Sequence, residues 1–155
     1  MKKRYYILGL LLLVFLGIQL VPSELPEVKA NNPGDIIQSG LVNQDVAALL
    51  KKSCYDCHSN ESVFPWYSHI APSSWLVAKD IREGREELNF SEWENYDMMK
   101  KLSLLDDIAI AVKEGEMPMQ IYLLMHPSSK LDENQRQSII DWAEESMDIV
   151  AEEED

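Results

Sequence analysis

The run Cys54-Tyr55-Asp56-Cys57-His58 constrains the fold of this chain more than any other feature of its sequence. It holds the only two cysteines of the 155 residues. Two thiols three positions apart can each bond one vinyl group of a haem, and the histidine that follows can turn its imidazole onto the iron. The sequence therefore predicts one covalently attached haem, a haem c, with His58 as an axial ligand and a domain folded around it.

Three other chemistries use cysteines at this spacing, and they remain alternatives at this point. A thioredoxin-type redox pair needs a preceding strand in a βαβ unit, and no strand is indicated before Cys54. A zinc site would have to recruit His69 and His126 from distant parts of the chain. A disulfide between Cys54 and Cys57 would close a very short loop and stabilise the fold little.

Residues 1–22 have the pattern of an export signal or a membrane anchor. Basic residues at positions 2–4 precede an apolar run from Tyr5 to Val21 that only Gln19 interrupts. As a helix this run is about 25 Å long, which is short for a hydrocarbon core of about 30 Å. We expect a signal that is cleaved near Ala30 or retained as an anchor, and we favour the anchor. The basic flank predicts a periplasmic or other extracytoplasmic location for the rest of the chain.

The remainder of the sequence predicts a spacer followed by one small all-α domain. Residues 23–39 are rich in Pro, Asn, Gly and Glu, which is typical of a linker. We expect the folded domain to span residues 40–150 as a bundle of four or five helices, because no segment has the period of a β-strand. Residues suited to begin these helices are Asn43, Ser73 or Ser74, Ser91 with Glu94, Ser103 with Asp106, and Asp132 with Gln135, and Gly115 is suited to end one.

The charge of the chain limits its partners. The net charge is −13, and residues 31–155 alone hold 25 acidic and 10 basic side chains, a net −15. Such a domain repels nucleic acid phosphates and anionic lipid headgroups. We therefore predict no nucleic acid partner, and we expect a redox protein with a basic surface. The same charge would also keep an exported protein soluble.

Several stretches of the chain, in order, carry a family resemblance: Cys54 to Asn60, Pro65 to Ser68, Ile70 to Pro72, Trp75-Leu76, Gly84-Arg85, Leu88 to Ser91, Gly115 to Pro118, Tyr122, His126-Pro127 and Trp142. With these stretches the chain resembles the small haem-binding domain family of bacterial exported c-type cytochromes. The resemblance implies a single haem in a cytochrome c-like fold, and the reaction of that family is generally not established. At His69 the chain departs from the family, where Asn is expected, so no role is carried over to this residue.

Met117 is the predicted sixth ligand of the iron. It lies in a Gly-Glu-Met-Pro sequence between two predicted helices, far downstream of His58, as the methionine ligand does in single-haem cytochromes c. An axial thioether is a common way in which cytochromes raise their reduction potential. The alternatives that the sequence leaves open are Met119, Met125, His69 and His126.

The sequence thus predicts a single-haem carrier of one electron rather than an enzyme, and it indicates no catalytic residue. The alternative is a haem enzyme or gas sensor in which the sixth ligand is labile. The candidates for contacts to the haem ring and its propionates are Trp66, Tyr67, Trp75 and Arg85.

Overall fold

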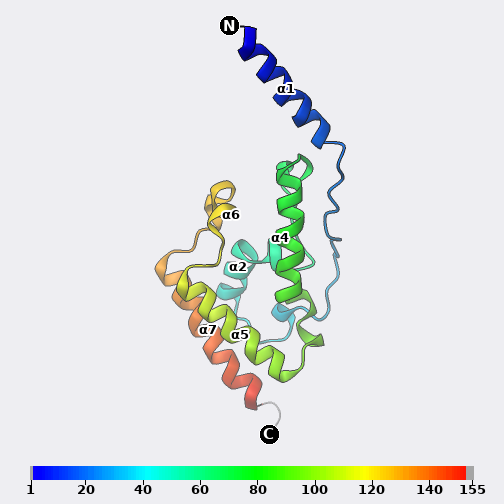
Figure 1. Cartoon of the computed structure of the whole chain (residues 1–155). Coiled ribbons are helices and arrows are strands. Elements are labelled where there is room, and N and C mark those ends of the chain that lie inside the picture. Colours follow the sequence, from blue (N-terminus) through cyan, green and yellow to red (C-terminus); the bar gives the residue numbers. More distant parts are fainter. Residues whose placement is uncertain (1, 153–155) are drawn as a thin grey trace.

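The computed structural model describes residues 2–152, and in this part of the chain it contains helices and no strand (Figure 1). The prediction of an all-α fold is therefore confirmed. The α-helices are α1 (Lys2–Ile18), α2 (Gln44–Ser53), α3 (Tyr55–His58), α4 (Ser73–Glu87), α5 (Met98–Glu114), α6 (Gln120–Met125) and α7 (Glu133–Glu152). Short 3₁₀ segments connect them: η1 (Ile36–Gln38), η2 (Trp66–His69), η3 (Phe90–Asn95) and η4 (Pro127–Ser129).

Three of the predicted helix boundaries are confirmed. The Asn43 side chain accepts a hydrogen bond from the backbone N–H of Val46 at 2.9 Å and so caps α2. Asp132 and Gln135 each accept a hydrogen bond from the other's backbone N–H, which is the expected capping box of α7. Gly115 ends α5 with a φ of 74°, a left-handed conformation that glycine adopts without steric cost.

The predicted serine caps are wrong, although α4 does begin at Ser73. Ser73 is the first residue of α4, but its hydroxyl donates to the carbonyls of Tyr67 and Ile70 and does not cap the helix. Ser91 lies inside η3, because the preceding Asn89 caps that segment. Ser103 lies inside α5. The residue that caps this helix is Asp97, six positions before the predicted cap.

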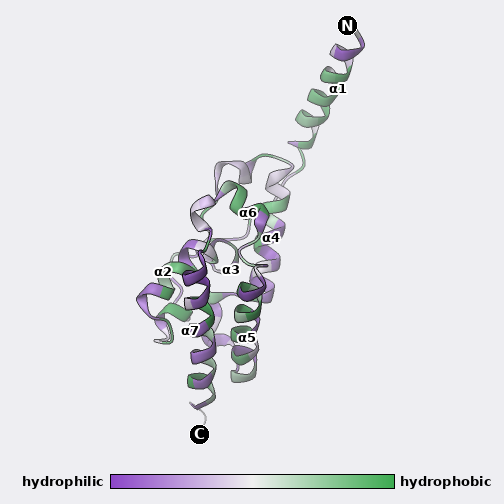
Figure 2. Ribbon diagram, turned by 90° about the vertical axis from the view of Figure 1, so that its left-hand side faces the viewer, coloured by the Kyte–Doolittle hydropathy of each residue, from purple (hydrophilic) through white to green (hydrophobic). Residues whose placement is uncertain are grey.

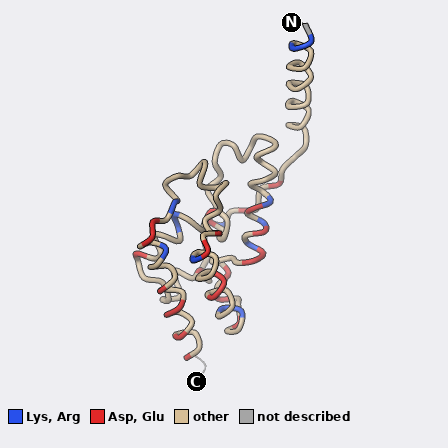
Figure 3. The backbone as a smooth tube through the Cα atoms, turned by 60° about the vertical axis from the view of Figure 1, so that its left-hand side comes forward, with Lys and Arg blue, Asp and Glu red and all other residues tan. Residues whose placement is uncertain are grey.

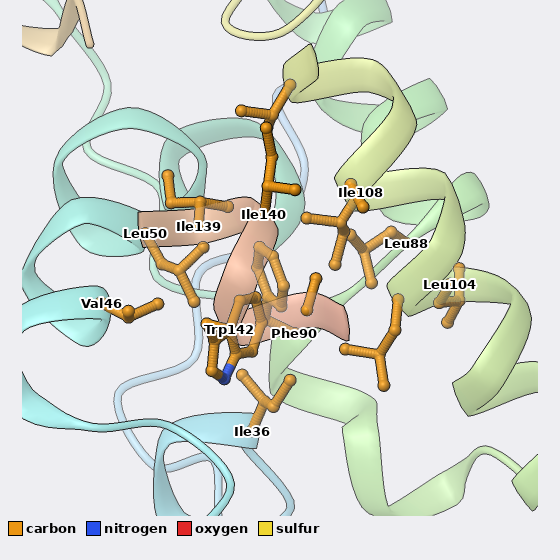
Figure 4. Close-up of a cluster of buried hydrophobic side chains, with 14 of the residues drawn as sticks. Ile36, Val46, Leu50, Leu88, Phe90, Leu104, Ile108, Ile139, Ile140 and Trp142 are labelled. Atoms are coloured by element: carbon orange, nitrogen blue, oxygen red, sulfur yellow. The ribbon is translucent and has the colours of Figure 1, made fainter. Parts of the chain in front are cut away.

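The hydrophobic core lies between α5 and α7, which run side by side, and α2 packs against α7 (Figure 1). Trp142 on α7 belongs to this core and donates its indole N–H to the carbonyl of Leu41 at 3.0 Å. Figure 4 shows the side chains that meet here from η1, α2, the end of α4, η3, α5 and α7, namely Ile36, Val46, Leu50, Leu88, Phe90, Leu104, Ile108, Ile139, Ile140 and Trp142.

The segment 23–39, predicted as a linker, lies along α4 and ends in the core. The side chains of Arg82 and Arg85 on α4 donate to the backbone carbonyls of Glu24 and Glu27 at 2.8 and 2.7 Å. Ile36 is fully buried. The segment therefore contributes both to the surface of α4 and to the hydrophobic core.

Helix α1 projects from one end of the domain (Figure 1). Its surface is apolar around its whole circumference, and its charged residues lie at its N-terminal tip (Figures 2 and 3). Among residues 2–152, no helix combines the length and the apolar character that crossing a membrane requires.

Ile36→Ala tests whether the predicted linker belongs to the folded unit. Removing a fully buried isoleucine side chain should lower the free energy of unfolding by about 2–5 kcal/mol. The matched control is Ile149→Ala on α7, where the side chain is 46% exposed and a loss within about 0.5 kcal/mol is expected. Equal denaturant midpoints for the two variants would show that residue 36 does not take part in the core.

Candidate functional site

The motif predicted to carry the chemistry lies where α2 passes directly into the one-turn helix α3. Cys54 is both the C-cap residue of α2 and the N-cap residue of α3. Its carbonyl accepts hydrogen bonds from the backbone N–H groups of Cys57 and His58. This single turn brings the side chains of Cys54, Cys57 and His58 onto the wall of one hollow. The three predicted residues therefore form a single site.

The imidazole of His58 is held by two backbone carbonyls near the end of α4. Its Nδ1 lies 2.9 Å from the carbonyl oxygen of Gly84 and 3.1 Å from that of Leu88. Two acceptors at this nitrogen assign the proton to Nδ1 and leave Nε2 as the nitrogen with a lone pair for a metal. Burial lowers the pKa of His58, which favours the neutral form that a ligand requires.

The acceptors of His58 lie at the end of α4 and not at its start, near Pro72. Pro72 precedes the first residue of α4, whereas His58 contacts the opposite end of that helix, at Gly84 and Leu88. The carbonyl of Gly84 also accepts the last hydrogen bond of the helix, from the backbone N–H of Leu88, and the carbonyl of Leu88 lies just beyond the helix. His58 therefore shares one acceptor with the helix and has the other to itself.

Gly84 allows α4 to approach the motif closely. A Cβ atom built on Gly84 would lie 2.9 Å from the backbone oxygen of Cys57, closer than real Cβ contacts. Any side chain at this position would push α4 away from α3 and would lengthen the His58 hydrogen bonds. The absent side chain is therefore a structural requirement of the site.

The two cysteines are not bonded to each other and are largely buried. Burial raises the pKa of Cys54 to about 12 and that of Cys57 to about 11, so both are neutral thiols at pH 7. Redox-active cysteine pairs have lowered pKa values, so these thiols do not fit a thioredoxin-type pair. Among residues 2–152, no group of three or more His, Cys, Asp and Glu side chains is arranged to hold a metal, as a zinc site would need.

Three adjoining hollows surround the motif, with volumes of about 430, 290 and 210 Å³. The smallest contains all three motif side chains, and it shares Cys54 and His58 with the largest and Cys57 with the third. Their combined size is in the range of sites for organic ligands and cofactors. The lining is mainly apolar, with Leu88, Phe90, Leu104 and Ile108 on one side and Val63, Leu76, Val77 and Ile121 on the other.

Met117 lines the same two hollows as His58. The loop that carries it is fixed where α5 ends, because the backbone N–H groups of Glu116 and Met117 both donate to the carbonyl of Ala111. The structure thus brings the predicted sixth ligand and the predicted first ligand to a common cavity. Met119 lines the smallest hollow as well, so it also reaches the site.

The other candidate ligands lie farther from His58 or are engaged elsewhere. His126 and Met125 line the 290 Å³ hollow, of which His58 is not part. The Nε2 of His126 lies 2.7 Å from the hydroxyl of Tyr67, and its ring stacks on that of Tyr122. His69 lines a separate hollow beside the end of α1.

Of the four side chains considered for contacts to a haem, only Tyr67 lines a hollow of the site. Trp66 is 70% exposed. Trp75 donates to the carbonyl of Val21 at 3.4 Å. The guanidinium of Arg85 donates to the carbonyl of Glu27 and to the hydroxyl of Ser62, so its predicted role toward a propionate gains no support.

The hydrogen bond between Tyr122 and Asp56 is a feature of the site that sequence reasoning missed. The Tyr122 hydroxyl on α6 donates to the Asp56 carboxylate at 2.8 Å and so fastens α6 to α3. The two residues are 66 positions apart, and no spacing in the sequence links them. The contact holds the 117–119 loop, which leads into α6, against the motif.

The comparison with protein families identifies the family of the chain. A family model described as a haem-binding domain matches residues 13–145. The chain belongs to the haem-binding domain family. No curated protein and no solved structure gives a significant match. The match begins inside α1 and ends inside α7, so the haem-binding domain includes the segment that lies along α4.

Gly84→Ala tests the close approach of α4 to the motif. Replacing glycine by alanine inside a helix normally stabilises the helix by about 1 kcal/mol, so the variant would be more stable than the wild type if there were free space at position 84. Here the added Cβ meets the Cys57 backbone at 2.9 Å, and overpacking of this kind costs about 1–3 kcal/mol. We expect a lower melting temperature by circular dichroism. In the control Gly34→Ala the nearest atom lies at 3.5 Å, so little change is expected, and an increase for Gly84→Ala would contradict the contact.

Proposed function

We propose that this haem-binding domain is a single-haem c-type cytochrome that transfers one electron at a time outside the cytoplasmic membrane. One observation carries the proposal: Cys54, Cys57 and His58 line one hollow, and the Nε2 of His58 is left as a ligand atom. When bound, the haem supplies an iron centre that cycles between two oxidation states.

The residues present fit a covalently bound haem. The thiols of Cys54 and Cys57 are neutral and border the cavity, and as thioethers they would prevent loss of the group. His58 would bind the iron through Nε2, and its bonds to Gly84 and Leu88 fix the orientation of the ring. Met117 would supply a thioether from the same cavity. The apolar lining, with Leu88 and Phe90, would exclude water.

We also propose an extracytoplasmic location, either periplasmic or equivalent. Its support is the basic flank at positions 2–4 followed by the apolar α1, together with the export that covalent haem attachment at such a motif requires. The intact mass of the protein from its native host distinguishes the two fates of α1. A mature start near Asn31 would show cleavage and would defeat the anchor that we favour.

The first functional prediction is that the haem stays on the polypeptide after acid-acetone extraction, because two thioether bonds survive denaturation. Cys54→Ser and Cys57→Ser should each weaken or abolish covalent loading. Met119→Ala, at a residue beside the same hollow, is the control and should leave it intact. A colourless wild-type protein after extraction would refute covalent attachment.

The second functional prediction is that Met117 binds the iron opposite His58. A thioether on ferric low-spin haem gives a weak far-red charge-transfer band, which Met117→Ala should abolish while opening the iron to carbon monoxide. Met117→His should keep six-coordination and lower the potential, since axial ligands move haem potentials within a range of about 0.8 V.

The controls for Met117 are Met119→Ala and His126→Ala, which should keep the band. A band that survives Met117→Ala and vanishes in a control would move the assignment to the other residue. A wild-type protein without the band that binds carbon monoxide readily would instead favour the alternative, a haem enzyme or gas sensor with a labile sixth ligand.

The third functional prediction concerns the redox partner. Six acidic residues border the two hollows that contain His58, so a basic protein surface would be attracted to the site; they are Asp56, Asp80, Glu83, Glu87, Asp107 and Glu116. Association with such a partner should slow as salt shortens the screening length from about 10 Å at 0.1 M to about 3 Å at 1 M. A rate that does not depend on salt would leave solubility as the role of the charge.

A further inference from the structure

The charged residues of the chain are absent from three long stretches. Residues 5–23, 62–78 and 117–129 contain no Asp, Glu, Lys or Arg, although charged residues make up 26% of the whole. The first stretch is α1 and its end, the second contains η2 and the start of α4, and the third contains α6 and η4. We infer that these stretches form one lipid-facing end of the molecule, on which the haem-binding domain lies against a bilayer surface.

Hydrogen bonds join the three stretches at one place. The side-chain amide of Gln19 donates to the carbonyl of Ala71 and accepts from its N–H, both at 3.0 Å, so the end of α1 is fixed to the loop before α4. The hydroxyl of Tyr67 lies 2.7 Å from Nε2 of His126, which joins the second stretch to the third. Figure 3 shows the result: the end of the domain from which α1 projects carries almost no charge, and the acidic residues lie on the rest.

This end exposes large apolar side chains. Leu124 on α6 is 80% exposed and Trp66 in η2 is 70% exposed. The uncharged end patch, as we name it, consists of Trp66, Ile70 and Leu124, each exposed by more than a third and none of them part of a hollow of the haem site. Exposed apolar side chains gathered at one end of a molecule mark an interaction surface.

The continuity of the uncharged end patch with α1 indicates that lipid covers it. A helix that is apolar on all sides is normally buried in a protein or in a membrane, whereas α1 projects away from the other helices of the domain (Figure 2). Because Gln19 holds the base of α1 at the patch, a bilayer surface that takes up part of α1 without being crossed by it also meets the patch. Tryptophan and tyrosine, here Trp66 and Tyr67, are the side chains that favour the membrane–water interface.

The acidic surface is compatible with this orientation because it lies elsewhere. Glu83, Glu87, Asp107 and Glu116 border only the His58 hollows and would remain in water, open to a soluble redox partner. Asp56 and Asp80 also line the 290 Å³ hollow beside Cys57. Zwitterionic lipid is the expected surface, since anionic headgroups would repel a domain of this net charge.

Labelling from the lipid phase tests the inference. The full-length holoprotein is reconstituted into phosphatidylcholine vesicles with a carbene-generating photoprobe dissolved in the hydrocarbon, and tryptic peptides are mapped by mass spectrometry. We expect label in α1 and also in peptides 53–79 and 114–130, with little in 137–155. Label confined to α1 would overturn the inference, because the domain would then not meet the lipid.

Matched variants sharpen this test. Leu124→Glu should lower the labelling of peptide 114–130 several-fold, whereas Ile149→Glu, on the exposed side of α7 away from the patch, should leave it unchanged. Unchanged labelling in Leu124→Glu, or cross-linking of 114–130 to the same peptide of a second copy, would show that lipid is not the occupant. The absorption spectrum of each sample reports separately whether haem is bound. A failure of the proposed haem attachment can therefore be distinguished from a failure of the proposed contact with lipid.

Discussion

The site depends on the contact between the imidazole of His58 and the last turn of α4. The carbonyl groups of Gly84 and Leu88 accept the hydrogen bond from the Nδ1–H group of His58. This interaction sets the tautomer, the ring orientation and the direction of Nε2. It is possible only because Gly84 has no side chain, so that α4 can lie against the backbone of Cys57. The segment 24–27 lies on the outer side of the same helix and ties it to the N-terminal part of the domain.

The features of the site that are local in sequence could be predicted from the sequence. The spacing of Cys54, Cys57 and His58 is fixed by one helical turn, and the Gly-Glu-Met-Pro loop of Met117 follows from the left-handed end of α5. Both depend on fewer than six consecutive residues, where backbone chemistry decides the outcome. The family match supports haem binding over nearly the whole chain.

The features that were missed are contacts between distant residues. The hydrogen bond from Tyr122 to Asp56 and the burial of Ile36 depend on how the helices pack, and no periodicity reports such packing. The serine caps failed for a related reason. A serine hydroxyl can donate as well as accept, and at Ser73 the carbonyls of a tight preceding loop compete with the helix end. The role of Gly84 could not be predicted from the sequence either, because a glycine inside a helix indicates only a lower helix propensity at that position.

The central claim is that two thioether bonds and His58 hold one haem in the hollow beside α3. The reduced pyridine haemochrome spectrum tests it most directly, because pyridine replaces the axial ligands and the band position then depends on the vinyl groups of the haem. We predict the position of a haem with both vinyl groups saturated, in wild-type protein purified with its colour. A band at the position of unmodified protohaem would contradict this claim, since the haem would then not be attached through Cys54 and Cys57.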